Sequence, residues 1–296
     1  MSGIMLESQK VVQGAYNAFK RRVIEIDYLQ STTKNVYQKT LLELDKKIQT
    51  EENYPTKSSH GVNFLLRDIA TGTLSHCELN IFSATEEERL VRELYNRQYQ
   101  ILLVDAYEAF KKFLETSYSM LSESNTNFYI KKFHNKNNEL IRFESLKFLK
   151  KFHSETPEIE SIINLRNTQD SKQPDIDMTL FLIALIEKLR HHIVHSQGLI
   201  QDKEKFIGDV IKNAGLSSKS TPDQRYRDEL NVYLGNEQYL NLICLLEVYV
   251  TTNQFHDRLG GLIRELISYT EFIHGYIARH FLSYPQKATG FPLSRE

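Results

Sequence analysis

The sequence has no tryptophan, two cysteines and no long apolar run, and each shortage excludes a class of protein. Cys77 and Cys244 lie far apart without metal-type spacing, so neither a disulfide framework nor a zinc module is expected. The longest apolar run, near Phe181 to Ile186, is far too short to cross a bilayer. The N-terminus lacks a basic start followed by an apolar signal region. We therefore expect a cytoplasmic protein with no membrane contact.

Glycine and proline are also scarce, at 12 and 6 residues, which favours helices over a turn-rich β architecture. The chain has no glycine-rich phosphate loop and no G-x-S-x-G motif, so kinase, ATPase, dinucleotide-binding and α/β-hydrolase functions have no support. No cofactor is expected. The net charge of −1 argues against a protein that coats nucleic acid over its whole surface, but it allows a local basic groove.

Apolar spacing predicts a long N-terminal helix over residues 5–52. Mostly apolar residues recur alternately every four and three residues along one face, the seam, with one irregular spacing before Leu41. No proline or glycine interrupts the helix between Gly14 and Pro55. Two interpretations stay open: a coiled-coil or dimerisation arm, and a helix packed on its own bundle. The predicted seam residues are Val12, Tyr16, Phe19, Val23, Ile26, Gln30, Thr33, Tyr37, Leu41, Leu44 and Ile48.

The region that follows is the most loop-like of the first half, and residues 61–70 within it suggest a short helix. Thr85–Glu88 resembles a capping box and predicts the start of a strong helix that runs to about Leu121. Three tyrosines, Tyr95, Tyr99 and Tyr107, are expected on the flanks of this helix. Its predicted inner stripe is Leu90, Leu94, Gln98, Leu102, Ala106, Ala109, Phe110 and Phe113.

Two amphipathic helices are predicted in the last third of the chain, over residues 203–215 and 255–281. Between them, residues 230–242 suggest a small β-hairpin, and a helix over residues 238–252 is the alternative. The expected fold is therefore all-α, a helical bundle with a long N-terminal helix and at most one small hairpin. We divide it into an N-terminal helix and connector (1–82), a helical domain (83–284) and a tail (285–296).

Residues 129–153 are distinctly basic, and aromatic residues, mostly phenylalanine, are interleaved with the lysines. Such a mixture suits a track along an RNA backbone with stacking platforms for bases. An amphipathic helix with buried phenylalanines and solvated lysines produces the same pattern. The candidate RNA-binding lysines are Lys131, Lys132, Lys136, Lys150 and Lys151.

The segment Asp177–Gly198 combines a buried helix with an unusual polar end. An apolar block, residues 178–186, leads into Arg190-His191-His192-Ile193-Val194-His195. Asp175 or Asp177 can cap the start and Gly198 can close the end, which gives a helix of roughly 20 residues. Positive charge suits a helix C-terminus, but a lysine would serve that purpose as well, and three imidazoles would not be needed.

Spacing places His191 and His195 one turn apart on one face, while Arg190 must curl round to meet His195. Arginine binds phosphate oxygens through a planar fork, and a histidine with a pKa of about 6.5 can give or take a proton at neutral pH. Together they supply the groups that cleave RNA without a metal: a base for the ribose 2′-hydroxyl, a cation for the phosphorane and an acid for the leaving oxygen.

Residues 190–195 resemble the R-x4-6-H signature of HEPN domains (higher eukaryotes and prokaryotes nucleotide-binding), with His191 at the polar position after the arginine. No other arginine of the chain has a histidine five to seven residues later. The resemblance implies an all-α endoribonuclease that leaves 2′,3′-cyclic phosphate and 5′-hydroxyl ends. Arg190 would stabilise the phosphorane, His195 would be the acid or base, and His191 would orient substrate or share the proton transfer.

The same resemblance implies a homodimer in which two motif helices flank one cleft. It also implies a role as a toxin or abortive-infection effector in antiviral defence, with a protein antitoxin or regulatory partner. The match is firm over residues 175–198 and does not extend to the first 80 residues.

Two rival functions remain open from the sequence. The histidine pair His191 and His195 invites zinc, but position 192 is not the glutamate of the metalloprotease motif and no third ligand has suitable spacing, so no metal is expected. The alternative from another class is a non-catalytic helical module that binds a nucleotide or a partner protein.

Overall fold

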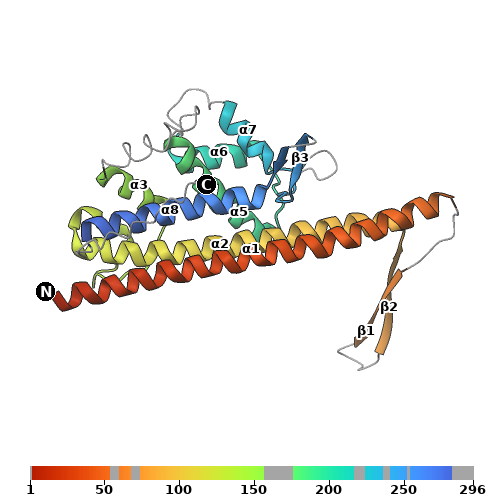
Figure 1. The fold of residues 1–296 in the computed structure, drawn as a ribbon, viewed down its shortest axis with the longest axis horizontal. Helices are drawn as coiled ribbons and strands as arrows, with labels where there is room; N and C mark the ends of the chain where they lie inside the picture. The colour runs from red at the N-terminus through yellow and green to blue at the C-terminus, as the bar shows by residue number, and fades with distance from the viewer. Residues whose placement is uncertain are drawn as a thin grey trace, which may run out of the picture.

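The computed structural model describes residues 2–53, 60–67, 74–156, 176–216, 224–235, 241–251 and 254–281. They form an all-α helical bundle with a long N-terminal helix, which confirms the predicted fold class. Helices α1 (Ser2–Asn53) and α2 (Ala84–Ser124) lie side by side as two long antiparallel rods, and the shorter helices gather along one part of them (Figure 1).

The predicted seam of α1 is its buried face. Val12, Phe19 and Ile26 are almost completely buried, and further along the helix Leu44 is buried as well. The helix packs on α2 and on α8 (Arg258–Phe281) of its own chain, so the structure shows the second of the two interpretations, a helix packed on its own bundle. Gln30 is a polar residue within this apolar seam. Its buried amide is satisfied because it donates a hydrogen bond to Asp257 Oδ1 (3.1 Å), just before α8.

Helix α2 begins with a capping box, but two residues earlier than predicted. Ser83 is the N-cap, and its hydroxyl and backbone N–H exchange hydrogen bonds with Glu86, the third helical residue. The prediction at Thr85–Glu88 was wrong because several serine, threonine and glutamate residues in this stretch satisfy the same pattern.

The predicted inner stripe of α2 is correct only in its second half. Leu102, Ala106, Phe110 and Phe113 are buried, whereas Leu90, Leu94 and Gln98 are exposed. In the first half the buried face is instead formed by tyrosine and amide side chains, including Tyr95, Asn96, Tyr99 and Gln100.

Hydrogen bonds explain why tyrosines occupy this buried face. The hydroxyls of Tyr95 and Tyr99 donate to the two carboxylate oxygens of Glu247, at 3.1 and 2.9 Å. Lys34 of α1 forms an ion pair with the same carboxylate at 3.2 Å. A buried tyrosine is stable where its hydroxyl finds a partner, and Glu247 supplies that partner from a distant part of the sequence.

The short helix predicted over residues 61–70 was wrong. Strands β1 (His60–Arg67) and β2 (Leu74–Phe82) pair antiparallel, with Phe64 opposite Cys77. Much of the β2 sequence alternates polar and apolar residues, which is a strand pattern. A helix of about ten residues is only marginally stable in isolation.

The hairpin predicted over residues 230–242 and its helical alternative were also wrong where the structure describes them, and residues 236–240 lie outside the described residues. Residues 224–232 form helix α7 (Gln224–Val232), and Leu234 meets Ile243 only in an isolated bridge. Residues 248–251, assigned to the alternative helix, form strand β3 (Val248–Thr251), which pairs with β4 (Gln254–His256). The expected tail, residues 285–296, lies outside the described residues.

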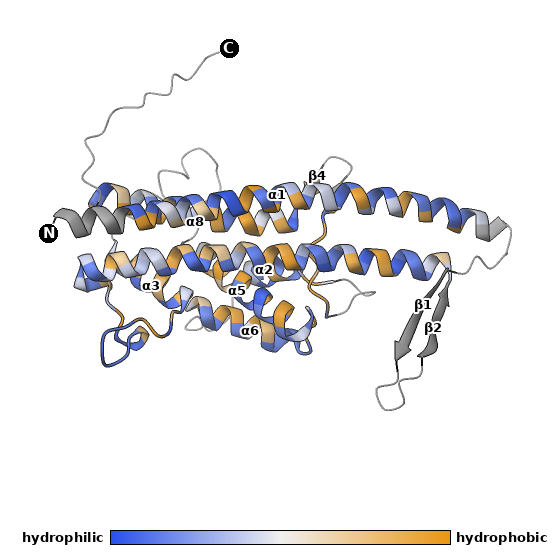
Figure 2. Ribbon diagram, turned by 90° about the horizontal axis from the view of Figure 1, so that it is seen from below, coloured by the Kyte–Doolittle hydropathy of each residue, from blue (hydrophilic) through white to orange (hydrophobic). Residues whose placement is uncertain are grey.

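Helix α5 (Ile176–Ser196) lies at the centre of the core. It packs against α2, α8 and α6 (Lys203–Ala214), and residues 183–186 are completely buried. Figure 2 shows apolar residues along α2 and α6, with α5 lying between them. Within the described part of the chain, no helix combines the length and the apolar character that a membrane crossing requires.

Helix α3 (Ser145–Glu155) carries His153, a half-buried histidine, from which we expect a pH dependence of stability. Its Nε2 lies 3.3 Å from the Tyr269 hydroxyl, and its Nδ1 is buried without a hydrogen bond among the described residues. Burial lowers the pKa of His153 to about 4, from an ordinary value of 6.5. Since protonation then favours the unfolded chain, the stabilising effect of the neutral ring is complete above pH 6.5 and is lost as the pH falls toward 4.

We therefore expect His153→Gln to flatten the pH dependence of the unfolding free energy, by about 2–3 kcal/mol between pH 7 and pH 4. Urea titrations of both proteins across this range measure the difference. Equal slopes for the two proteins would show that His153 does not carry the acid sensitivity.

Candidate functional site

The helix that carries the motif spans Ile176–Ser196, close to the predicted Asp177–Gly198. It ends in a left-handed turn in which Gln197 has φ +54° and Gly198 has φ +81°. The N–H of Gly198 donates to the carbonyl of His192 at 3.0 Å, which satisfies one of the last free carbonyls of the helix. Gly198 therefore closes the helix as predicted, while the candidate cap Asp175 lies outside the described residues.

Gly198 also lies against α2. A Cβ at this position would come within 2.5 Å of Gln100 Nε2, whose amide is buried and donates to the Ile243 carbonyl at 2.8 Å. Because the neighbour is held and φ is positive, we expect Gly198→Ala to lower the unfolding free energy by about 1–3 kcal/mol. Thermal denaturation measures this effect, and Gly208→Ala, with open space around its Cβ, is the matched control.

His191 and His195 lie together on the solvent face of α5, as the spacing predicts. Both side chains are exposed, and their ring centroids are 4.6 Å apart. His192 lies on another face, where its ring meets Phe206 and its Nδ1 is 3.3 Å from the Leu199 carbonyl. His192 also meets the His191 ring edge-on, at a centroid distance of 5.8 Å, but unlike His191 and His195 it is half-buried.

Partial burial lowers the pKa of His191, and the neighbouring rings of His195 and His192, together with Lys188 and Arg190, lower it further. His191 therefore stays neutral at pH values where an isolated histidine begins to take up a proton. At neutral pH it is able to accept a proton.

Arg190 does not curl back toward His195. Its guanidinium forms an ion pair with Glu108 of α2, and its Nε is buried without a hydrogen bond among the described residues. The side chain of Arg190 is 29% exposed and that of Glu108 is 42% exposed. The cation is therefore oriented by a carboxylate that the sequence analysis did not identify.

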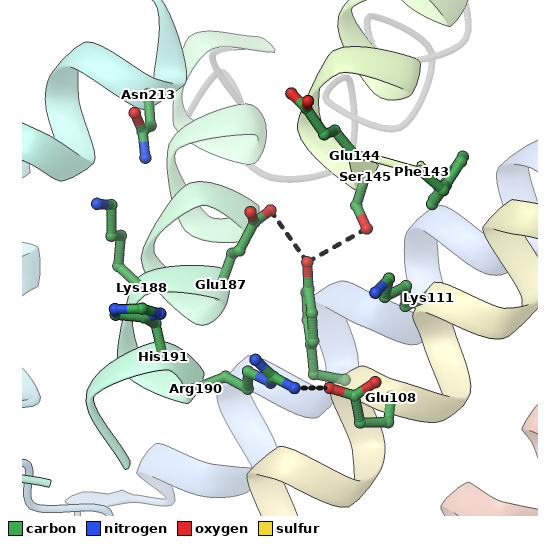
Figure 3. Close-up of a pocket in the computed structure, with 11 residues that line it drawn as sticks. Glu108, Lys111, Phe143, Glu144, Ser145, Glu187, Lys188, Arg190, His191 and Asn213 are labelled. Atoms are coloured by element: carbon green, nitrogen blue, oxygen red, sulfur yellow. Dashed lines mark hydrogen bonds and ion pairs between the residues drawn. The ribbon is translucent and has the colours of Figure 1, made fainter. Parts of the chain in front are cut away.

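Arg190 and His191 line a polar pocket of about 240 Å³ between α2, α5, the start of α3 and the end of α6. Figure 3 shows their side chains at its edge, with Glu187 above them and Glu108 opposite Arg190. His195 lies outside the lining. The residues around the pocket are Tyr107, Glu108, Lys111, Phe143, Glu144, Ser145, Glu187, Lys188, Arg190, His191 and Asn213.

Glu187 is the most unusual group in this pocket. Its Oε2 accepts a hydrogen bond from the Tyr107 hydroxyl at 3.0 Å, and that hydroxyl lies 3.2 Å from Ser145 Oγ. Burial raises the pKa of the Glu187 carboxyl, although the Tyr107 hydrogen bond opposes this change. Glu187 was not among the predicted site residues, although it lies three and four residues before Arg190 and His191 and therefore shares their helix face.

The candidate RNA-binding lysines do not line this pocket. Lys131, Lys132 and Lys136 are exposed near the short helix η2 (Lys131–Phe133). The Lys150 ammonium instead donates to the Asn213 carbonyl at 2.6 Å, and Lys151 pairs with Glu155 at 2.7 Å.

Most of the phenylalanines interleaved with these lysines are not available as stacking platforms, which corrects that part of the prediction, whereas Phe143 is half-buried and lines the pocket. Phe128, Phe133, Phe148 and Phe152 are at most 1% exposed and belong to the core. Tyr129 is the aromatic residue of this stretch that remains exposed, at 38%.

Among the described residues, no group of three or more histidine, cysteine, aspartate or glutamate side chains could hold a metal ion. Comparison of the chain with protein-family models, with curated proteins and with solved structures finds no match. Functional inference therefore depends on the site itself.

Proposed function

We propose that the protein is a metal-independent endoribonuclease, with Arg190 as the charge-stabilising cation, His195 as acid or base, and His191 as the group that orients substrate or shares the proton transfer. The observation that carries this proposal is the grouping at the end of α5. The rings of His191 and His195 are 4.6 Å apart, and His191 shares a pocket with the Arg190 guanidinium.

In the proposed reaction an imidazole nitrogen accepts the proton of a ribose 2′-hydroxyl, and the 2′-oxygen forms a bond to phosphorus. The guanidinium stabilises the added negative charge of the phosphorane. The bond from phosphorus to the 5′-oxygen then breaks, and a protonated imidazole donates its proton to that oxygen. The products carry a 2′,3′-cyclic phosphate and a 5′-hydroxyl.

Glu108 must release Arg190, at least in part, for the guanidinium to contact phosphate. An ion pair between partly exposed groups contributes only about 0–1 kcal/mol, and both partners here are more than a quarter exposed. A phosphodiester can form two parallel hydrogen bonds with the guanidinium and so compete with a single carboxylate contact. The pair keeps Arg190 at the pocket edge without locking it.

A homodimer is part of the same proposal, since His195 lies outside the pocket that Arg190 lines. A hollow of about 430 Å³ lies where α2 meets the residues after α5. It is lined by four leucines and five polar residues: Leu90, Leu94, Leu199, Leu242, Glu93, Asn96, Arg97, Gln100 and Gln197. Leu94 and Leu199 are about half exposed. A second copy that covered this hollow would bring a second motif helix beside the first.

The remaining parts of the proposal rest on the HEPN resemblance. They are a role as a toxin or antiviral defence effector and a protein antitoxin or regulatory partner. The cytoplasmic location rests on the sequence composition instead. Among the candidate lysines, the exposed Lys131, Lys132 and Lys136 are suited to contact the RNA backbone.

The test is cleavage of single-stranded RNA in excess EDTA, with the product ends identified by mass spectrometry. Wild-type protein is expected to leave cyclic phosphates, and His195→Ala is expected to lose about 10²–10⁴-fold in rate. Because His195 is exposed, the variant should melt within about 2 °C of the wild type. Cleavage that depends on a divalent metal, or an active His195→Ala variant, would contradict the proposal.

A non-catalytic module that binds a nucleotide or a partner protein is the second candidate. The observation that favours it is the ion pair between Arg190 and Glu108, because a guanidinium held by a carboxylate can have a structural role. Nucleotide binding without cleavage, unaffected by His195→Ala, is the result that this candidate predicts.

A further inference from the structure

We propose that the pocket between α2, α3, α5 and α6 binds a guanine base of the RNA, with the Glu187 carboxylate as the group that recognises it. This inference rests on the proposed function for its link to RNA cleavage, but it concerns binding and can be tested separately. Its basis is a half-buried carboxyl with a single protein hydrogen-bond donor among the described residues, at the wall of an open polar pocket.

The pocket suits one small polar group. At about 240 Å³ it is smaller than the sites of about 300–1,000 Å³ that hold drug-sized ligands. Its lining carries three acids and three bases, Glu108, Glu144, Glu187, Lys111, Lys188 and Arg190. Two of them also pair outside the lining, Glu144 with Lys147 and Lys188 with Asp209. A balanced lining favours a neutral ligand rich in hydrogen-bonding groups, such as a nucleobase, over a free phosphate.

Glu187 has unused capacity to accept hydrogen bonds. Tyr107 donates to Oε2, and no hydrogen bond to Oε1 is found among the described residues. A carboxylate offers about four acceptor positions, so this carboxylate can accept further hydrogen bonds. Oε1 is not among the fully buried atoms that lack a partner, so a ligand in the pocket can reach it.

Guanine is the RNA base whose Watson–Crick edge carries two adjacent N–H donors, at N1 and N2. Adenine and cytosine each place a ring acceptor beside their amino group, and uracil places its single N–H between two carbonyls. The acceptor O6 of guanine also finds donors at this pocket, in the ammonium groups of Lys111 and Lys188 and the amide of Asn213.

The position of Glu187 fits the proposed chemistry. Glu187, Arg190 and His191 are spaced i, i+3 and i+4, so they lie on one face of α5. The helix rises about 6 Å over four residues. A ribose can span this length between a base bound in the pocket and the adjoining phosphate. A guanine held by Glu187 therefore places its phosphodiester near Arg190 and His191.

The experiment is calorimetric titration of the full chain, in EDTA at pH 7, with 3′-GMP, 3′-AMP, 3′-CMP and 3′-UMP. Wild-type protein is expected to bind 3′-GMP about tenfold or more tighter than the other three. Glu187→Gln replaces an acceptor by an amide of the same size and is expected to abolish this preference. Tyr107→Phe keeps the Glu187 carboxylate and is expected to retain the preference for 3′-GMP. Glu123→Gln changes an exposed acid of α2 and is the control for the loss of one negative charge.

Equal affinities for the four nucleotides, no binding, or a preference that survives in Glu187→Gln would each overturn the inference. Binding of N-acetyl-arginine amide in place of 3′-GMP would also overturn it and would assign the pocket to a partner protein. Preferential binding of 3′-GMP by a protein that cuts no RNA would contradict the proposed function alone. RNA cleavage with no base preference in binding would contradict this inference alone.

Discussion

Arg190→Ala is expected to lower kcat/KM for RNA cleavage by about 10²–10³-fold, of the order seen when a donor to a developing oxyanion is removed. The effect follows from charge, because the phosphorane carries one more negative charge than the diester and Arg190 is the arginine that lines the pocket beside His191. Folding should change little, since the side chain is partly exposed and its ion pair contributes about 0–1 kcal/mol. Single-turnover cleavage of a short RNA, with thermal melting of the same samples, measures both quantities.

Glu108→Gln is the matched control for this prediction, because it removes the same ion pair while keeping the guanidinium. If Arg190 acts on the phosphate, Glu108→Gln should cleave RNA at least as fast as the wild type. A loss in Glu108→Gln as large as that in Arg190→Ala would mean that the pair itself is required. Full activity in Arg190→Ala would remove Arg190 from the reaction.

Parts of the fold that depend on one segment could be predicted from the sequence. All eleven predicted seam positions of α1 are buried or half-buried in the structure, including the polar residues Gln30 and Thr33. The motif helix was predicted within two residues at each end because its apolar block and Gly198 are both strong local signals. Local periodicity determines these elements, so no knowledge of the neighbours was needed.

The predictions were wrong where the burial of a side chain depends on a partner that is distant in the sequence. The first half of α2 buries Tyr95 and Tyr99 instead of Leu90 and Leu94, because Glu247 supplies partners for both hydroxyls. That carboxylate lies about 150 positions further along the chain, as the separations of 152 and 148 show. Helical periodicity contains no information about it.

Only part of the candidate site could be predicted, because one of its charged groups comes from a different helix. Arg190, His191 and His195 share one helix, so their spacing was sufficient to place the two rings together. The acidic partner Glu108 comes from another helix and could be assigned only once α2 and α5 were seen to pack. Glu187 was within reach of sequence analysis, because it shares a helix face with Arg190 and His191.

Phe152→Ala is expected to lower the unfolding free energy by about 3–5 kcal/mol, the range for truncating a buried phenylalanine. The side chain is fully buried, and its ring packs edge-on against Phe272 and Tyr276 of α8 at centroid distances of 5.9 and 5.1 Å. Removing the ring leaves a cavity between α3 and α8 and removes these aromatic contacts. Urea denaturation followed by circular dichroism measures the change.

Tyr129→Ala is the comparison that separates core packing from RNA stacking, since Tyr129 belongs to the same aromatic stretch and is 38% exposed. It should change the unfolding free energy by less than about 1 kcal/mol. If the exposed part of this stretch contacts RNA, Tyr129→Ala should weaken binding of a single-stranded oligonucleotide by about 1–3 kcal/mol. A Phe152→Ala variant that kept wild-type stability and lost RNA affinity instead would restore the stacking role that burial of the ring now excludes.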